Sequence, residues 1–559
     1  MRKLRKMKKL IATALGAAAL ITAVFYAAPF QGAPPLARFF PSGPLLYLEA
    51  KDFQAELRAW NASEEQRRWL ASTRYQGFQR SNLYLKLNAA WTEFTAAAGF
   101  LPDSALVASL AGGQSALAIY DVGNLEFLYV TRIPTARAAQ TALWQSRAKY
   151  ETRRAGNVDF FVHVDSGRTV AFASTGDYLI LGTREELVAG ALRLLAGEPL
   201  TPVTQDAWFA DTTAAAGAAG ELRLVLNLEA LLKTPQYRSY WIQRNASEVR
   251  NYRAGIADLV RGGGEFREER IFLRKTATEP IAGSTDDLLR LAPDTAALCR
   301  SWAKPSAARV LALVEEKLLA PKVAPHISED YAPTVDVGSG ESGSESDLET
   351  RIDEPPLNTQ STIALDDLRR LLESASLDTA LEVQSGEHLP DGVFVTTPTV
   401  LAMKAASNWD SDSVRKALSA AAASLWSVSP SGTGWATHQR GARTWYSLEG
   451  LAPLEVAIDG NLLLMADSEQ ILGAALDRLD LRATPSDAAS VALFRHLASR
   501  DDYRKIMSVL DHTQTNARPA FFSTDLWSVS DIFSDVREVE VRTRDAGSNL
   551  RETVTYRMK

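Results

Sequence analysis

A strand followed by a helix occurs twice in this chain, in one constant register. The two segments are GDYLILGTREELVAGALRLL at 176–195 and GNLLLMADSEQILGAALDRL at 460–479, which start 284 positions apart. In each segment a short apolar run predicts a strand buried on both faces, and the residues behind it repeat at the spacing of one apolar helix face. A chain that carries this unit twice is predicted to fold into two similar parts.

The start of each predicted helix has the chemistry of a helix cap. Thr183 precedes the first helix with Glu186 three positions later, and Asp467 and Gln470 hold the same places in the second segment. A hydroxyl or carboxylate at the first position accepts a hydrogen bond from a free backbone N–H, and the Glu or Gln bonds back. Both segments therefore predict a capped helix start.

A second pair of segments keeps the same shift. Arg267 corresponds to Arg551 and Lys275 to Lys559, each pair 284 positions apart. Each segment follows a Gly-bearing turn, which predicts a hairpin. Two separated matches in one register predict a tandem duplication. The expected division is unit A at 41–275, a linker at 276–290 and unit B at 291–559.

Each unit is predicted to be α+β, with an antiparallel or mixed sheet and helices on one face, because strands outnumber helices and several lie close enough for hairpins. The two units are expected to be related by a pseudo-two-fold axis. In unit A the expected strands are 45–49, 115–120, 126–133, 160–163 and 170–173, and the expected helices are 135–150 and 185–195. In unit B they are strands 393–396, 400–404, 444–447, 454–458 and 462–465, with a helix at 411–425.

One segment of unit B has no counterpart in unit A. Residues 325–360 are rich in Ser, Gly, Pro and acidic residues and lack apolar periodicity. Such a segment buries too little surface to offset its ordering entropy, which predicts a disordered acidic loop. A calcium site is the alternative, but the spacing of an EF-hand is absent.

The N-terminus predicts a membrane anchor. Residues 1–9 contain six basic and no acidic residues, and residues 10–30 carry no charge. A 21-residue helix is about 30 Å long, the thickness of a bilayer core, and the basic tail is expected to stay in the cytoplasm. Residues 31–40 then form a short spacer. A cleaved signal peptide is the alternative, and in either case the body is exported.

Charge and cysteine content narrow the function classes. Without the six basic residues of the tail, the chain has 55 basic and 67 acidic residues, a net charge of −12. This balance argues against a nucleic-acid partner, which requires a basic face, and against broad adhesion to anionic lipid. Cys299 is the only cysteine, so no intrachain disulfide can form, and its apolar surroundings predict a buried residue.

Two segments carry a resemblance to a known family. LLYLEAKDF at 45–53 and AGGQSALAIYDVG at 111–123, together with the predicted anchor and the duplicated body, resemble a family of exported bacterial proteins known only as a domain of unknown function. The resemblance covers most of residues 40–559. It implies a bacterial, envelope-facing protein, and it brings no catalytic residues. The predicted anchor places the body on the extracytoplasmic, periplasmic side of the cytoplasmic membrane.

The sequence offers one weak catalytic pattern and no metal or cofactor site. Ser301 and Lys304 match S-x-x-K, which in penicillin-interacting enzymes places a serine nucleophile one helical turn from a lysine. The accompanying S-D-N and K-T-G motifs are absent. No two of the six histidines have local metal-ligand spacing, and no nucleotide fingerprint is present. A catalytic triad assembled by folding is still open.

Aromatic residues distinguish unit A from unit B. Between positions 53 and 100 they recur near helical spacing, whereas the corresponding helices of unit B are aliphatic. Such a stripe is typical of a core, and the alternative is a recognition surface for a partner or ligand. The candidate surface residues are Trp60, Trp69, Tyr75, Phe78, Tyr84 and Trp91.

Together these features predict a membrane-anchored extracytoplasmic binding or scaffold module of the bacterial envelope. The expected partners are the membrane, through the N-terminal helix, and an envelope protein or an apolar ligand. No catalytic residue, metal or cofactor is assigned. The alternatives are an exported serine hydrolase that uses Ser301 and Lys304 or an assembled triad, and a structural spacer.

Overall fold

The computed structural model describes residues 35–559 except 73–74, 77–78, 80–81, 99–103, 166, 235–248, 263, 282–284, 320–364, 387–388, 392–393, 424–433, 449–452, 484–486, 499 and 501–534. The predicted anchor and acidic loop lie outside the described residues. Within the described ranges, no helix is both long and apolar enough to span a bilayer.

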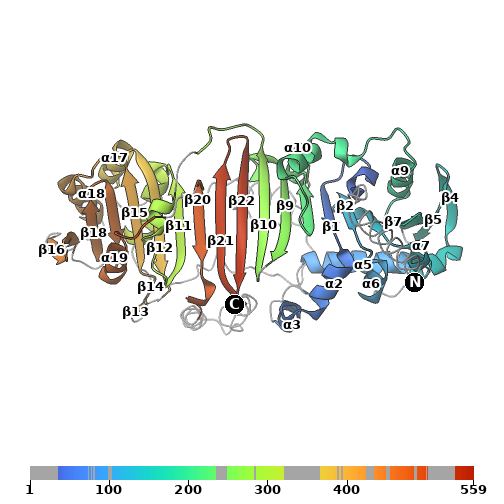
Figure 1. The fold of residues 1–559 in the computed structure, drawn as a ribbon, viewed down its shortest axis with the longest axis horizontal. Coiled ribbons are helices and arrows are strands. Elements are labelled where there is room, and N and C mark those ends of the chain that lie inside the picture. Colours follow the sequence, from blue (N-terminus) through green and yellow to red (C-terminus); the bar gives the residue numbers. More distant parts are fainter. Residues whose placement is uncertain are drawn as a thin grey trace, which may run out of the picture.

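Among the described residues, one antiparallel sheet of twenty strands runs the length of the elongated molecule (Figure 1). With its helices the fold is mixed α/β, and the sheet is antiparallel, which is one of the two arrangements that the sequence predicts. The strands of the N-terminal half are β1 (Leu46–Ala50), β2 (Ser115–Asp121), β3 (Glu126–Arg132), β4 (Glu151–Ala155), β5 (Val158–Asp165), β6 (Arg168–Thr175), β7 (Tyr178–Gly182), β8 (Leu222–Leu226), β9 (Tyr252–Gly262) and β10 (Glu265–Arg274).

The strands of the C-terminal half are β11 (Ala296–Ala303), β12 (Leu377–Ser385), β15 (Thr399–Ala405), β16 (Trp435–Arg440), β17 (Arg443–Leu448), β18 (Leu454–Asp459), β19 (Leu462–Ala466), β20 (Ser490–Phe494), β21 (Val536–Asp545) and β22 (Asn549–Met558). The predicted strand at 393–396 is β14 (Phe394–Thr396), which among the described residues pairs with β13 (Leu389–Asp391) in a separate two-stranded sheet.

The two halves pair their strands in the same order. From the middle outward, the N-terminal half runs β10-β9-β8-β1-β2-β3-β7-β6-β5-β4. The C-terminal half runs β22-β21-β20-β11-β12-β15-β19-β18-β17-β16. Strands β10 and β22 pair with each other at the centre and make the sheet continuous (Figure 1).

Helices cover both faces of the sheet, so the prediction of helices on one face is wrong. Neighbouring residues of β7 enter different cores: Ile180 packs with Phe40, whereas Leu179 packs with Phe94 from the opposite side. In β19 all five residues of Leu462–Ala466 are buried, which requires cover on both sides. The second half likewise has one core on each face.

The helices and short helical turns of the first half are η1 (Leu36–Phe39), α2 (Phe53–Ala62), α3 (Glu64–Ala71), α5 (Asn82–Ala97), α6 (Ser104–Leu110), α7 (Thr135–Ala138), α8 (Ala142–Gln145), η2 (Ser146–Lys149), α9 (Glu185–Leu195), η3 (Val203–Gln205), α10 (Ala207–Ala216) and α11 (Leu228–Leu231). Those of the second half are α14 (Asp286–Leu289), α15 (Ala307–Val314), the π-helical turn η4 (Glu315–Leu319), α17 (Asp366–Ser374), α18 (Ser411–Ala423) and α19 (Glu469–Leu476).

The predicted helix at 135–150 is three short pieces, α7, α8 and η2. Thr141 interrupts it, since its backbone is extended and its hydroxyl accepts from the Trp144 N–H to begin α8. By contrast, α9 spans the predicted residues 185–195. The segment 135–150 therefore breaks into short helices because a polar cap residue, Thr141, lies inside its apolar pattern.

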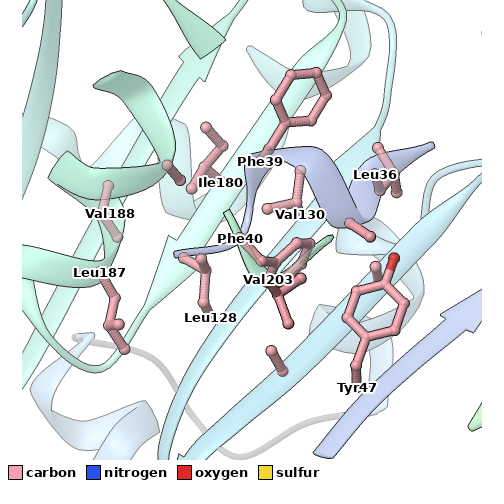
Figure 2. Close-up of a cluster of buried hydrophobic side chains, with 14 of the residues drawn as sticks. Leu36, Phe39, Phe40, Tyr47, Leu128, Val130, Ile180, Leu187, Val188 and Val203 are labelled. Carbon is pink, nitrogen blue, oxygen red and sulfur yellow. The ribbon is translucent and has the colours of Figure 1, made fainter. Parts of the chain in front are cut away.

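Two segments predicted as connectors belong to the core instead. Residues 36–40 were expected to be spacer, but Leu36 and Phe40 are fully buried beneath α9, and Figure 2 shows them among Leu128, Val130 and Ile180 of the sheet. In the predicted linker at 276–290, Leu288 of α14 is also buried, in a core of the second half. Large apolar side chains in both connectors explain this burial.

The two residues predicted to cap helices, Thr183 and Asp467, form hydrogen bonds with strands instead. Thr183 Oγ1 accepts from the Phe127 N–H at 2.8 Å, and Asp467 Oδ1 accepts from the Thr399 N–H at 2.7 Å. The residues before α9 and α19 are Arg184 and Ser468, neither of which makes a side-chain cap. The two polar side chains therefore bind the backbone near the start of β3 and of β15. These two strands have the same position in the strand order of their halves.

Candidate functional site

Helices α2 and α3 follow directly from the sheet. Strand β1 ends at Ala50, and Asp52 caps α2 by accepting from the Ala55 N–H at 2.9 Å. The Phe53 N–H then donates to the Gly113 carbonyl at 3.0 Å, so the first turn of α2 is fixed to the strand connection before β2. These bonds set the direction in which the aromatic helices leave the sheet.

Ser63 makes the corner between the two helices. Its hydroxyl donates to the Trp60 carbonyl at 2.8 Å and accepts from the Gln66 N–H at 3.1 Å. One side chain thus ends α2 and begins α3, and its extended backbone turns the chain between them.

Two ion pairs attach these helices to both halves of the molecule. Glu56 of α2 pairs with Arg261 at the end of β9, and Arg68 of α3 pairs with Asp535, which precedes β21 in the other half. The side chains of Arg68 and Asp535 are about one third exposed, at 34% and 30%. Water screens pairs at that exposure, so we assign them a positioning effect more than a stabilising one.

The structure separates the predicted aromatic set into different environments. Trp91 stacks on Phe94 with ring centroids 6.1 Å apart and packs against a core, as the usual interpretation of such a stripe predicts. Trp69 and Tyr75 form a half-buried edge-to-face pair at 5.9 Å. Tyr84 is half-buried on α5, and Phe78 lies outside the described residues.

Among the described members of the set, Trp60 is the exposed one. Its relative exposure is 46%, and Leu70 of α3, which the sequence interpretation missed, is 47% exposed. Arg58 and Arg67 are exposed on the same two helices. We call Arg58, Trp60, Arg67 and Leu70 the α2–α3 surface. Leu70 follows Trp69 in sequence. Helical periodicity alone does not predict that Trp69 is half-buried while Leu70 is exposed.

Ser301 and Lys304 do not form the expected helical pair. Ser301 is fully buried in strand β11, with its hydroxyl 3.1 Å from the carbonyl oxygens of Thr285 and Ala380. Lys304 follows the end of the strand and pairs with Asp378 on the surface. The hydroxyl therefore satisfies buried backbone groups, and the lysine is engaged elsewhere.

A serine and a histidine that the sequence analysis did not select lie within hydrogen-bond distance of each other. His438 Nε2 lies 2.7 Å from Ser447 Oγ across the β16–β17 hairpin, and the imidazole stacks on Trp445 at 5.1 Å. The hairpin register was the signal that could have found them, because residues near a turn face one another across strands. Ser447 is 7% exposed.

A buried carboxylate lies beside this pair. Glu455 is opposite Ser447 in the β17–β18 register and accepts from the Trp445 indole N–H at 3.0 Å. Burial raises the pKa of Glu455 above its ordinary value, and the indole bond acts against that shift. Because its hydrogen bond goes to Trp445, the carboxylate does not orient the imidazole as the acid of a triad does.

The other histidines with a described position make ring contacts. His163 on β5 lies 5.3 Å from the Tyr150 ring, and His496 lies 5.9 Å from the Phe494 ring. His326, His388 and His512 lie outside the described residues. In the part of the chain that the structure describes, no group of three or more His, Cys, Asp and Glu residues could hold a metal ion.

Comparison with known proteins adds little to this geometry. No family model matches the chain, and no curated protein matches it. Two solved structures, crystal forms I and III of TP0453, are each 12% identical to it, with TM-scores of 0.23 and 0.22. Each likeness covers 44% of this chain and 82% of the other. Scores this low transfer neither a fold nor a function.

Proposed function

We propose that this chain is a membrane-anchored extracytoplasmic binding or scaffold module of the bacterial envelope, with a body built by tandem duplication. Residues 10–30 are the anchor, and the body follows on the periplasmic side. The family resemblance at 45–53 and 111–123 favours the same placement.

The common strand order of the two halves supports the duplication. Thr183 and Asp467 lie 284 positions apart and make the same type of bond to β3 and β15. Polar side chains of different chemistry fill one role at matching positions, which is what divergence of a copied unit produces. Alignment of the two halves as rigid bodies tests this: strands of the same rank should superimpose, and a match of the outer strands alone would contradict it.

The α2–α3 surface is the observation that carries the binding role. Trp60 and Leu70 are about half exposed on helices held to both halves by the Glu56–Arg261 and Arg68–Asp535 ion pairs. Exposed tryptophan on a positioned element is typical of a recognition site, because it brings a large apolar area with little loss of side-chain entropy.

Fractionation and photocrosslinking in cells test the proposal. The full chain should remain with the membrane after alkaline washing, and a chain that lacks residues 1–34 should be released. A photoreactive residue in place of Trp60 should give a reproducible adduct, whereas the same residue at exposed Thr437 on β16 should not. Full-length protein in the soluble fraction would refute the anchor.

The serine hydrolase alternative now depends on the His438–Ser447 pair, because Ser301 is buried behind its carbonyl partners. An acylating probe applied to the full chain separates the two functions. Labelling that disappears in Ser447→Ala would favour a hydrolase, and equal labelling of both proteins would remove the alternative.

A further inference from the structure

We propose that the α2–α3 surface lies in the interface of the same lipid bilayer that holds the N-terminal helix, with Trp60 and Leu70 among the lipids. This inference rests on the proposed function, because it takes residues 10–30 as the anchor. It identifies the partner of the surface as lipid and gives the body a fixed orientation on the membrane.

The first step is the length of the tether. Leu36 is fully buried in the core of the first half, and its neighbours Phe39 and Phe40 are buried with it. The predicted membrane span ends at Phe30, so six peptide steps connect the span to the core. A fully extended chain of that length reaches about 22 Å at most. With residues 10–30 as the anchor, this tether keeps Leu36 within about 22 Å of the end of the membrane span.

The second step connects the tether to α2 through contacts of the structure. The Phe39 ring lies 5.2 Å from the Tyr178 ring, and the Arg132 guanidinium lies 5.7 Å from the centre of that same ring. The Gly113 N–H donates to the Arg132 carbonyl at 3.0 Å, and the Gly113 carbonyl accepts from the N–H of Phe53, the first residue of α2. Helix α2 therefore begins at the end of the sheet where the N-terminal segment enters the fold.

The third step is the chemistry of the surface. Tryptophan is favoured at the level of the lipid headgroups, and leucine favours the adjoining acyl region. Arg58 and Arg67 are exposed on the same two helices as Trp60 and Leu70 and can contact headgroup phosphates. The body without its tail carries a net charge of −12, so this contact is local and apolar and does not require anionic lipid.

A depth measurement on the full chain tests the inference. The chain is placed in nanodiscs of phosphatidylcholine, and Ala59→Cys, exposed next to Trp60, carries an environment-sensitive fluorophore. Cys299 should not be labelled, since it is fully buried and burial raises the pKa of its thiol to about 12. Thr437→Cys, exposed on β16 in the other half, is the matched control.

Spin-labelled lipid should quench the probe at position 59 at least threefold more than the probe at 437. Replacing Trp60 and Leu70 by serine should reduce that excess. Equal quenching at the two positions, with the chain incorporated in the discs, overturns the inference and leaves the proposed function intact. A chain that does not enter the discs overturns both. In cells, a photoreactive residue at position 60 should give lipid adducts, and adducts only to protein would also overturn the inference.

Discussion

The Thr553 hydroxyl donates a hydrogen bond to Glu269 Oε2 at 2.8 Å, across the register pair where β22 meets β10. The two residues are 284 positions apart, the same separation as the matching strand–helix segments. In the proposed duplication each residue thus faces its own counterpart. A pseudo-two-fold axis would pass between them, as in a self-complementary dimer interface.

The Glu269–Thr553 bond should contribute modestly to the joining of the two halves. Thr553→Val removes the donor and keeps the shape, so the free energy of unfolding should fall by about 1 kcal/mol, the usual net value of one hydrogen bond. Denaturant titration measures it. A double-mutant cycle with Glu269→Ala, which removes the acceptor, should return a coupling energy of similar size, and a coupling near zero would contradict the bond.

The Arg274–Asp545 ion pair is the stronger link between the halves. Arg274 ends β10, and its guanidinium donates to both carboxylate oxygens of Asp545 in the β21–β22 hairpin. The two side chains are only 14% and 5% exposed. Removing one partner from such a pair leaves a buried charge, so Asp545→Asn should reduce stability by about 3 kcal/mol. Asp211→Asn, which breaks the exposed Arg253–Asp211 pair, is the control and should have an effect below about 1 kcal/mol.

The same pair predicts a pH dependence. The bond from Arg274 holds the pKa of Asp545 below its ordinary value. The stabilisation is therefore present above the unfolded-state pKa and is lost as pH falls through the lower folded-state pKa. The stability gap between the wild type and Asp545→Asn should narrow as pH falls from 6 toward 3. A gap of constant size over that range would show that the bond is not electrostatic.

Sequence periodicity predicted the elements well and their partners poorly. Residues 185–195 form the predicted helix, and the hairpin turns lie at the predicted glycines. The pairing of β10 with β22 was not predicted, because alternation within a strand does not say which edge of another strand it will meet. Thr183 and Asp467 were assigned to helix ends for a related reason, since their hydrogen bonds go to strands distant in sequence.

The sequence predicted aromatic residues in the candidate surface, but it did not predict which of them are exposed. Trp60 and Trp91 belong to one aromatic pattern, yet one is 46% exposed and the other packs on Phe94. Helical spacing places residues on a face but does not identify what lies opposite that face. The contacts that decide it involve Gly113 and Asp535, which no local pattern connects to these helices.

Substitution of Trp91 and Trp60 should therefore have different effects on stability. Trp91→Ala removes an aromatic side chain from a packed environment and should lower the free energy of unfolding by about 3 kcal/mol. Trp60→Ala should change it by less than about 1 kcal/mol, because the side chain is about half exposed. Thermal unfolding followed by circular dichroism measures both, and strong unfolding by Trp60→Ala would assign that residue to the core.

Gly112 is required by close packing at the connection that fixes α2. A Cβ atom there would lie 2.2 Å from the Arg132 carbonyl oxygen, whereas nothing lies within 4 Å of a Cβ at the adjacent Gly113. The Gly112 carbonyl also accepts from the Gln54 N–H in the first turn of α2. Gly112→Ala should therefore destabilise the protein by about 2 kcal/mol or more.

Gly113→Ala is the matched control and should be neutral or slightly stabilising, because alanine restricts the unfolded chain without a clash. Hydrogen exchange at the first turn of α2 distinguishes a local effect from a global one. Gly112→Ala should speed exchange at Phe53 and Gln54, and equal exchange in both variants would contradict the role given to this connection.

The contribution of Glu455 to the free energy of unfolding should change with pH in the direction opposite to that of Asp545. It is 8% exposed, and burial raises its pKa above the unfolded value. A raised carboxylate pKa means that wild-type stability declines as pH rises from the unfolded value through the folded one. Glu455→Gln keeps an oxygen for the Trp445 indole and has no charge to bury, so it should gain stability relative to the wild type between pH 4 and pH 8. Chemical denaturation at each pH measures the difference in unfolding free energy between Glu455→Gln and the wild type. A difference that shrinks with rising pH would show that the carboxylate is better solvated than its position indicates.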